Sequence, residues 1–119
     1  FAMAVDKVYV LKLEDTSLEH LPGGGYVQRI ITKSGTGMDL TFSKGCLKPG
    51  CGHHMHDHPT QDEAVFCLEG EGTMTIEGMG DVHYKAGMAL VIPKGVKHQN
   101  KNTGSKDTFV VSMFNPALR

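Results

Sequence analysis

Short strand-like runs recur along the whole chain, and this pattern limits the fold more than any other feature of the sequence. The runs are rich in β-branched and aromatic residues, and glycine or proline interrupts them about every 8 to 12 residues. No segment repeats apolar residues at helical spacing over more than about two turns. The pattern predicts an all-β sandwich or barrel of about ten short antiparallel strands. The expected strands are 8–13, 26–32, 38–47, 53–58, 63–69, 73–77, 82–84, 88–92, 96–102 and 107–114.

The size and charge of the chain restrict its partners. The chain has 119 residues and a formal net charge of −1, which suits one domain over residues 1–119. There is no basic stripe of the kind that binds nucleic acid. No apolar run reaches the roughly 18 residues that span a bilayer, and no signal peptide is visible. Cys46, Cys51 and Cys67 include no CxxC pair, which favours a reducing, cytoplasmic location over a disulfide framework.

Four of the seven histidines lie in the run from 53 to 58. Side chains alternate between the faces of a strand, so His54, His56 and His58 are expected on one face, about 6.6 Å apart. His53 should point the other way. Two imidazoles at this spacing can share one metal ion at about 2.0–2.1 Å from each. Glu63 follows after a turn and can add a carboxylate oxygen, so the run indicates a divalent metal site.

Two spaced motifs contain these residues. The first reads G-x5-H-x-H-x4-E-x6-G over residues 50–70, and the second reads G-x5-P-x-G-x2-H-x3-N over residues 87–102. Together, and in this order, they resemble both signature motifs of the cupin superfamily. The resemblance implies a jelly-roll β-barrel with a metal ion inside its mouth. It also implies four protein ligands, which are His56, His58, Glu63 and His98.

The donor set indicates which ions and molecules the site would bind. Three neutral imidazoles and one carboxylate suit Fe, Mn, Ni, Cu or Zn, and they leave one or two coordination positions open. About one net positive charge remains, which favours an anionic or chelating small molecule. His54, Tyr26 and Tyr84 are the candidates for a general base or hydrogen-bond donor beside the ion. Gln28 is a further candidate for the cavity wall.

Several functions are compatible with a cupin-like site, because one fold supports many chemistries. The leading hypothesis is a mononuclear-metal dioxygenase that oxidises a small chelating molecule. The second is a non-redox isomerase, lyase or cyclase in which the metal polarises a carbonyl. The third is a binding module without catalysis. The resemblance also implies a homodimer, in which residues 5–13 could exchange between subunits as an edge strand.

Overall fold

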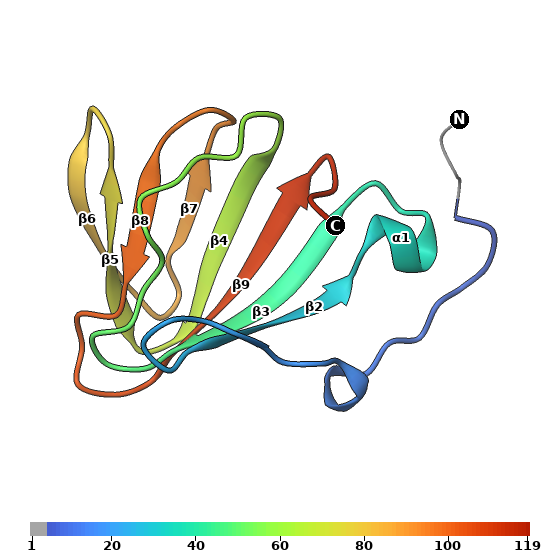
Figure 1. Cartoon of the computed structure of the whole chain (residues 1–119), viewed down its shortest axis with the longest axis horizontal. Helices are drawn as coiled ribbons and strands as arrows, with labels where there is room; N and C mark the ends of the chain where they lie inside the picture. The colour runs from blue at the N-terminus through green and yellow to red at the C-terminus, as the bar shows by residue number, and fades with distance from the viewer. Residues whose placement is uncertain (1–4) are drawn as a thin grey trace.

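Two antiparallel sheets packed face to face form the body of the protein in a computed structural model, which describes residues 5–119 (Figure 1). The larger sheet has the strand order β1-β2-β3-β9-β4-β7, and the smaller has the order β6-β5-β8. The strands are β1 (Glu19–His20), β2 (Tyr26–Ile31), β3 (Thr41–Leu47), β4 (Asp62–Glu69), β5 (Glu71–Ile76), β6 (Gly80–Lys85), β7 (Ala89–Ile92), β8 (His98–Lys101) and β9 (Thr108–Asn115). The all-β jelly-roll prediction is confirmed, although the sheets form an open sandwich and do not close into a barrel.

Two short helical elements accompany the strands, one before β1 and one between β2 and β3. They are the 3-10 helix η1 (Leu13–Asp15) and the helix α1 (Lys33–Thr36), and neither was expected from the sequence. Thr32 caps α1 by accepting a hydrogen bond from the backbone N–H of Gly35 at 3.0 Å. Gly37 ends this helix with a φ of 83°, a left-handed conformation that glycine adopts without strain. No helix in residues 5–119 has both the length and the apolar character to span a bilayer.

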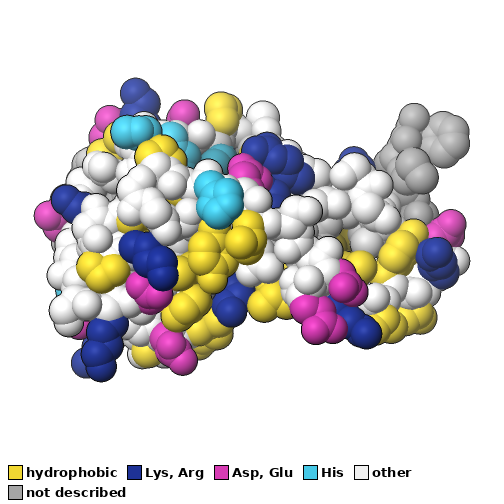
Figure 2. All heavy atoms as spheres, turned by 60° about the horizontal axis from the view of Figure 1, so that its bottom comes forward, with side chains coloured by type: hydrophobic (Ala, Val, Ile, Leu, Met, Phe, Trp, Pro, Cys, Tyr) yellow, Lys and Arg dark blue, Asp and Glu magenta, His cyan; other side chains and the backbone are white. Residues whose placement is uncertain are grey.

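The hydrophobic core lies between the two sheets. It is formed by alternate residues of the facing strands, which are Val65, Cys67, Met74, Tyr84, Ile92 and Val110. The opposite face of β4 is partly open, because Phe66 is 41% exposed between two buried neighbours. Hydrophobic side chains also gather on the molecular surface in the view of Figure 2. The large sheet therefore has a packed inner face and a partly apolar outer face.

Two of the expected strands were wrong. Residues 8–12 form an irregular segment in which Val8 is 87% and Val10 is 83% exposed, because no strand among residues 5–119 pairs with them. Residues 53–58 run beside β8 but make only two isolated bridges there, Gly52 with Lys101 and His56 with His98. Between these two bridges the chain advances by four residues on one side, from 52 to 56, and by three on the other, from 98 to 101. This one-residue excess, as in a β-bulge, interrupts the regular ladder.

Candidate metal centre

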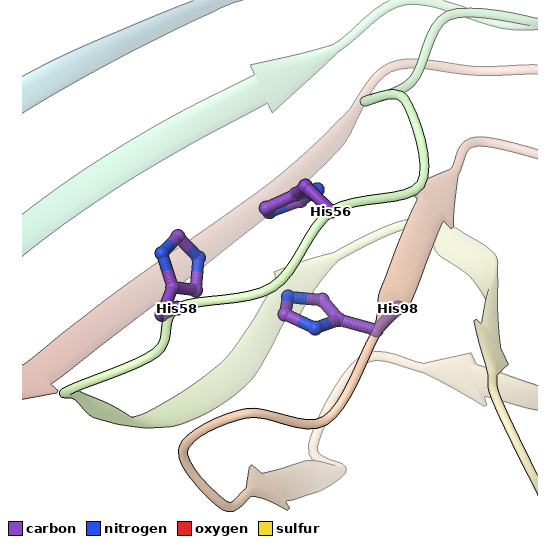
Figure 3. A group of neighbouring side chains, drawn as sticks. All are labelled: His56, His58 and His98. Atoms are coloured by element: carbon purple, nitrogen blue, oxygen red, sulfur yellow. The ribbon is translucent and has the colours of Figure 1, made fainter.

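Three histidines from two distant segments meet at one wall of the sandwich (Figure 3). His56 and His58 lie on the segment before β4, and His98 begins β8. The backbone joins these segments at the histidines themselves, because His56 N donates to His98 O at 3.0 Å and His98 N donates to His56 O at 2.8 Å. The potential ligand atoms of the three side chains all lie within 4.8 Å of one another. This histidine group could hold a metal ion.

Backbone carbonyls orient two of the imidazole rings. The His56 Nδ1 atom lies 2.6 Å from the carbonyl oxygen of His54, and the His98 Nδ1 atom lies 2.9 Å from that of Val96. A carbonyl only accepts, so each Nδ1 is the nitrogen that donates in these contacts, and Nε2 is the atom that offers a lone pair when the ring is neutral. In metal-binding histidines the ring nitrogen that does not contact the metal typically donates to such an acceptor. The tautomer needed for metal binding through Nε2 is therefore set by the chain.

Glu63 lies beside the histidine group. Its Oε1 atom is 3.1 Å from Nε2 of His98 and 3.6 Å from Nε2 of His58. Two ligands placed about 2.1 Å from one ion and at right angles to each other would be about 3.0 Å apart. The separation between Glu63 and His98 is close to this value, whereas that between Glu63 and His58, at 3.6 Å, is longer. Glu63 is also buried, where a carboxylate needs a positively charged or hydrogen-bonding partner.

The protonation of the histidines depends on burial and on Glu63. Burial lowers the pKa of His58, which favours the neutral imidazole that binds metals. Burial also lowers the pKa of His98, but its hydrogen bonds with Glu63 and the Val96 carbonyl outweigh this effect and leave the pKa above its usual value. The carboxylate thus favours positive charge at the position between the imidazoles.

A cavity of about 340 Å³ adjoins the histidine group. Its lining combines the metal-site residues with apolar side chains of the sandwich interior, which include Val65, Met74, Val110 and Phe114. Polar side chains from four strands also line it, and these are Arg29, Ser43, Asn100 and Ser112. A larger hollow of about 580 Å³ lies between the N-terminal segment and β2, but neither Glu63 nor any of the three histidines lines it. The smaller cavity is therefore the candidate site for a small molecule.

The other residues expected near the metal lie elsewhere. Tyr84 is fully buried and donates a hydrogen bond to Asn100 Oδ1 at 2.6 Å, so it supports the wall from behind. Tyr26 is not part of the cavity lining. Gln28 faces the opposite side of β2, where its side-chain amide donates to the carbonyls of Leu13 and Thr16. The expectation that these residues reach the cavity was wrong.

His53 and His54, the two histidines that precede His56, exchange their expected places. His54 is exposed and does not line the cavity, whereas His53 does. The reason is the extra residue in the segment beside β8, since a one-residue shift in a strand reverses the face of each side chain. His54 contributes through its carbonyl oxygen, which holds His56. The sequence shows no signal for this shift, because it arises from pairing with β8.

The fold and the site together define a jelly-roll β-sandwich protein with a histidine group that could hold a metal ion beside an internal cavity. Residues 44–114 match the family model of the cupin domain, and the chain therefore belongs to the cupin family. The L-ectoine synthase of Hyphomonas neptunium is 30% identical over 83 residues, which are 69% of this chain and 61% of that protein. The chain thus spans less than two thirds of the length of this relative.

Solved structures show the same fold. A predicted oxalate decarboxylase from Thermotoga maritima matches with a TM-score of 0.78 and 24% identity, over 89% of this chain and 97% of that chain. A recombinant oxalate oxidase in complex with glycolate matches with a TM-score of 0.76 and 23% identity, over 91% of this chain and 59% of that chain. These likenesses establish the architecture and leave the reaction to be inferred from the site.

Proposed function

We propose that the protein is a metal-dependent enzyme that acts on a small organic anion able to chelate the ion. The observation that carries the proposal is the convergence of the histidine group and Glu63 at the wall of the cavity. In this proposal one divalent transition ion is held by four residues, which are His56, His58, Glu63 and His98. When bound, such an ion polarises an oxygen of the substrate or exchanges electrons with O2.

The charge and shape of the site support an anionic substrate. One carboxylate against a doubly charged ion leaves about one net positive charge facing the cavity. The apolar walls formed by Val65, Val110 and Phe114 keep water away from this charge, which strengthens its attraction for an anion. Four protein ligands also leave room for a substrate to bind through one or two oxygens.

Within this class we favour oxidation of the bound molecule by O2, as in a mononuclear-metal dioxygenase. This chemistry requires a redox-active ion, which imidazole ligands accept, and it requires few acid–base side chains. Tyr26 and Tyr84, the tyrosines considered as general bases, do not line the cavity. The residues of the chain would then serve mainly to hold the ion, orient the substrate and exclude water.

His53 supports a second candidate, a non-redox isomerase, lyase or cyclase. This histidine lines the cavity, and its ring centre is 5.8 Å from that of His56. It is therefore placed to exchange a proton with a molecule bound at the ion.

A set of measurements on the Fe(II)-loaded protein separates these functions. Small 2-oxo acids, 2-hydroxy acids and dicarboxylates are added in turn, and oxygen uptake and the incorporation of solvent deuterium are followed. Oxygen uptake supports the dioxygenase, and deuterium incorporation without oxygen uptake supports the non-redox enzyme. Tight binding with neither signal identifies a binding module. The His58→Ala variant is the control, and activity that persists in it without bound metal contradicts the proposal.

We also propose a homodimer in a reducing, cytoplasmic compartment. Among residues 5–119, only β1 pairs with this edge of β2, at Tyr26 and Val27, so the edge beyond them is available to residues 5–13 of a second copy. Exposed Phe66, Val91 and Met113 add apolar surface for such an association. The cysteines are buried free thiols, as is usual in a reducing compartment. Light scattering at micromolar concentration tests the dimer, and a monomeric mass would contradict it.

A further inference from the structure

The cavity has a polar row at a distance from the metal-site residues. Arg29 of β2 pairs in register with Ser43 of β3, and Ser43 pairs with Ser112 of β9. All three side chains line the cavity. The row ends at Val65 of β4, two residues from Glu63. With strands about 4.8 Å apart and a two-residue step of about 6.6 Å, the Cα atoms of Arg29 and Glu63 are about 16 Å apart along the sheet.

Ser43 has an unsatisfied hydroxyl in the middle of this row. The residue is only 2% exposed, and its Oγ atom is buried without a hydrogen-bond partner among residues 5–119. Buried polar atoms are nearly always hydrogen-bonded, so an orphan hydroxyl on a cavity wall indicates a partner that enters the cavity. This partner has to be polar and has to reach the wall between Arg29 and Ser112.

Arg29 is held in place by Glu19 and keeps hydrogen-bond donors that this pair does not use. Its Nε and Nη2 atoms lie 3.1 Å and 3.5 Å from the carboxylate oxygens of Glu19, and no hydrogen bond in residues 5–119 uses Nη1. Arg119 lies 3.9 Å from the same carboxylate, so two guanidinium groups share one acid. A register shift in β2 between Arg29 and Ile31 marks a bulge, a feature that often re-aims a side chain beside a binding site.

We propose that the substrate carries a second carboxylate, which Arg29 and Ser43 bind while its other end chelates the metal ion. The unused Nη1 group of Arg29 can donate a charge-assisted hydrogen bond to a carboxylate oxygen, and the Ser43 hydroxyl can donate one further hydrogen bond to it. The surface between the two ends includes Val65 and Phe114, which suits the methylene groups of a short dicarboxylate. This inference rests on the proposed function and specifies the substrate class of that site.

Binding measurements with matched pairs of acids test the inference. Calorimetric titrations of the metal-loaded protein compare succinate with butyrate, glutarate with pentanoate, and adipate with hexanoate. A hydrogen-bonded charge pair should make at least one dicarboxylate bind about 10- to 100-fold tighter than the monocarboxylate of equal length. Elemental analysis of each sample measures its metal content independently.

Three variants locate the second carboxylate. Arg29→Met should bring the affinity ratio of the best pair close to one, and Ser43→Ala should lower it by a smaller factor. The control is Lys44→Met, which removes one positive charge from β3 at a position over the Phe109 ring on the outer face. This control should keep the full ratio. Arg29→Lys serves as a second variant if Arg29→Met does not fold, and it should retain only part of the ratio.

The possible results separate this inference from the function on which it rests. A wild-type protein that holds its metal but binds both members of every pair equally would overturn the second carboxylate and leave the metal enzyme standing. The same holds for an unchanged ratio in both the Arg29 and Ser43 variants. A wild-type protein that takes up no metal would refute the proposed function and, with it, this inference.

Discussion

Replacement of Tyr84 by phenylalanine removes a single oxygen atom from the core, and we expect it to destabilise the protein measurably. Tyr84 is fully buried, and its hydroxyl donates to Asn100 Oδ1 at 2.6 Å. In the variant the Oδ1 atom of Asn100 loses its hydrogen-bond donor, which lowers the free energy of unfolding by about 1–3 kcal/mol. With an unfolding entropy of about 2.1 cal/mol/K per residue, this loss lowers the Tm of a chain of 119 residues by about 4–12 °C.

The pKa of Tyr84 determines how the stability difference between the wild-type protein and Tyr84→Phe changes with pH. Burial raises the pKa of Tyr84 to about 12, although its hydrogen bond with Asn100 partly opposes this effect. In the unfolded chain the pKa is about 10. The folded protein therefore retains the proton more strongly, so the contribution of Tyr84 is complete below pH 10 and is lost as the pH rises from 10 to 12. Two pKa units correspond to about 2.7 kcal/mol.

Urea unfolding followed by far-UV circular dichroism tests both parts of this prediction. The wild-type protein should be more stable than Tyr84→Phe at pH 8, and this advantage should shrink steadily above pH 10. Burial also raises the pKa of Tyr26, but this group is present in both proteins and its effect cancels. Equal stability at pH 8, or a difference that stays constant up to pH 11.5, would refute the reasoning.

Three further predictions concern the metal site, a close backbone contact and the surface. His58→Ala should lose stoichiometric metal in elemental analysis but keep the circular dichroism spectrum of a β protein, because the apolar core provides most of the stability; an unfolded apoprotein would contradict this. Gly72→Ala should destabilise the protein by about 1–3 kcal/mol in urea unfolding, because the new Cβ overlaps the Tyr84 hydroxyl. Lys48→Met should change stability by less than about 1 kcal/mol, since its 2.7 Å pair with Asp107 is solvent-exposed, and a larger loss would show a stronger pair than expected.

The sequence predicted the parts of the site that depend on local spacing. His56 and His58 are two residues apart in a motif, and His98 follows a fixed turn, so their convergence could be inferred from the resemblance to cupins. The pattern of short strand-like runs also predicted the all-β jelly roll. Coordination of an ion by these residues stays a prediction.

Features that depend on pairing between distant segments could not be predicted. The places of His53 and His54 follow from one extra residue opposite β8, which only the pairing reveals. Residues 8–12 have the composition of a strand, but strand formation needs a neighbour, and no described strand of the same chain supplies one. Arg29 lies opposite Ser43 only because β2 and β3 pair in a particular register.

The reciprocal backbone hydrogen bonds between His56 and His98 affect which metal the protein would bind in a cell. They fix both imidazoles to the polypeptide frame, so their spacing does not depend on an arriving ion. Under the proposed function, competing cations meet the same rigid set of donors, and their intrinsic affinities then follow the general order for first-row metals. Cellular availability should therefore decide the occupant, and the same polypeptide made in iron-rich and in zinc-rich medium should be isolated with different elements.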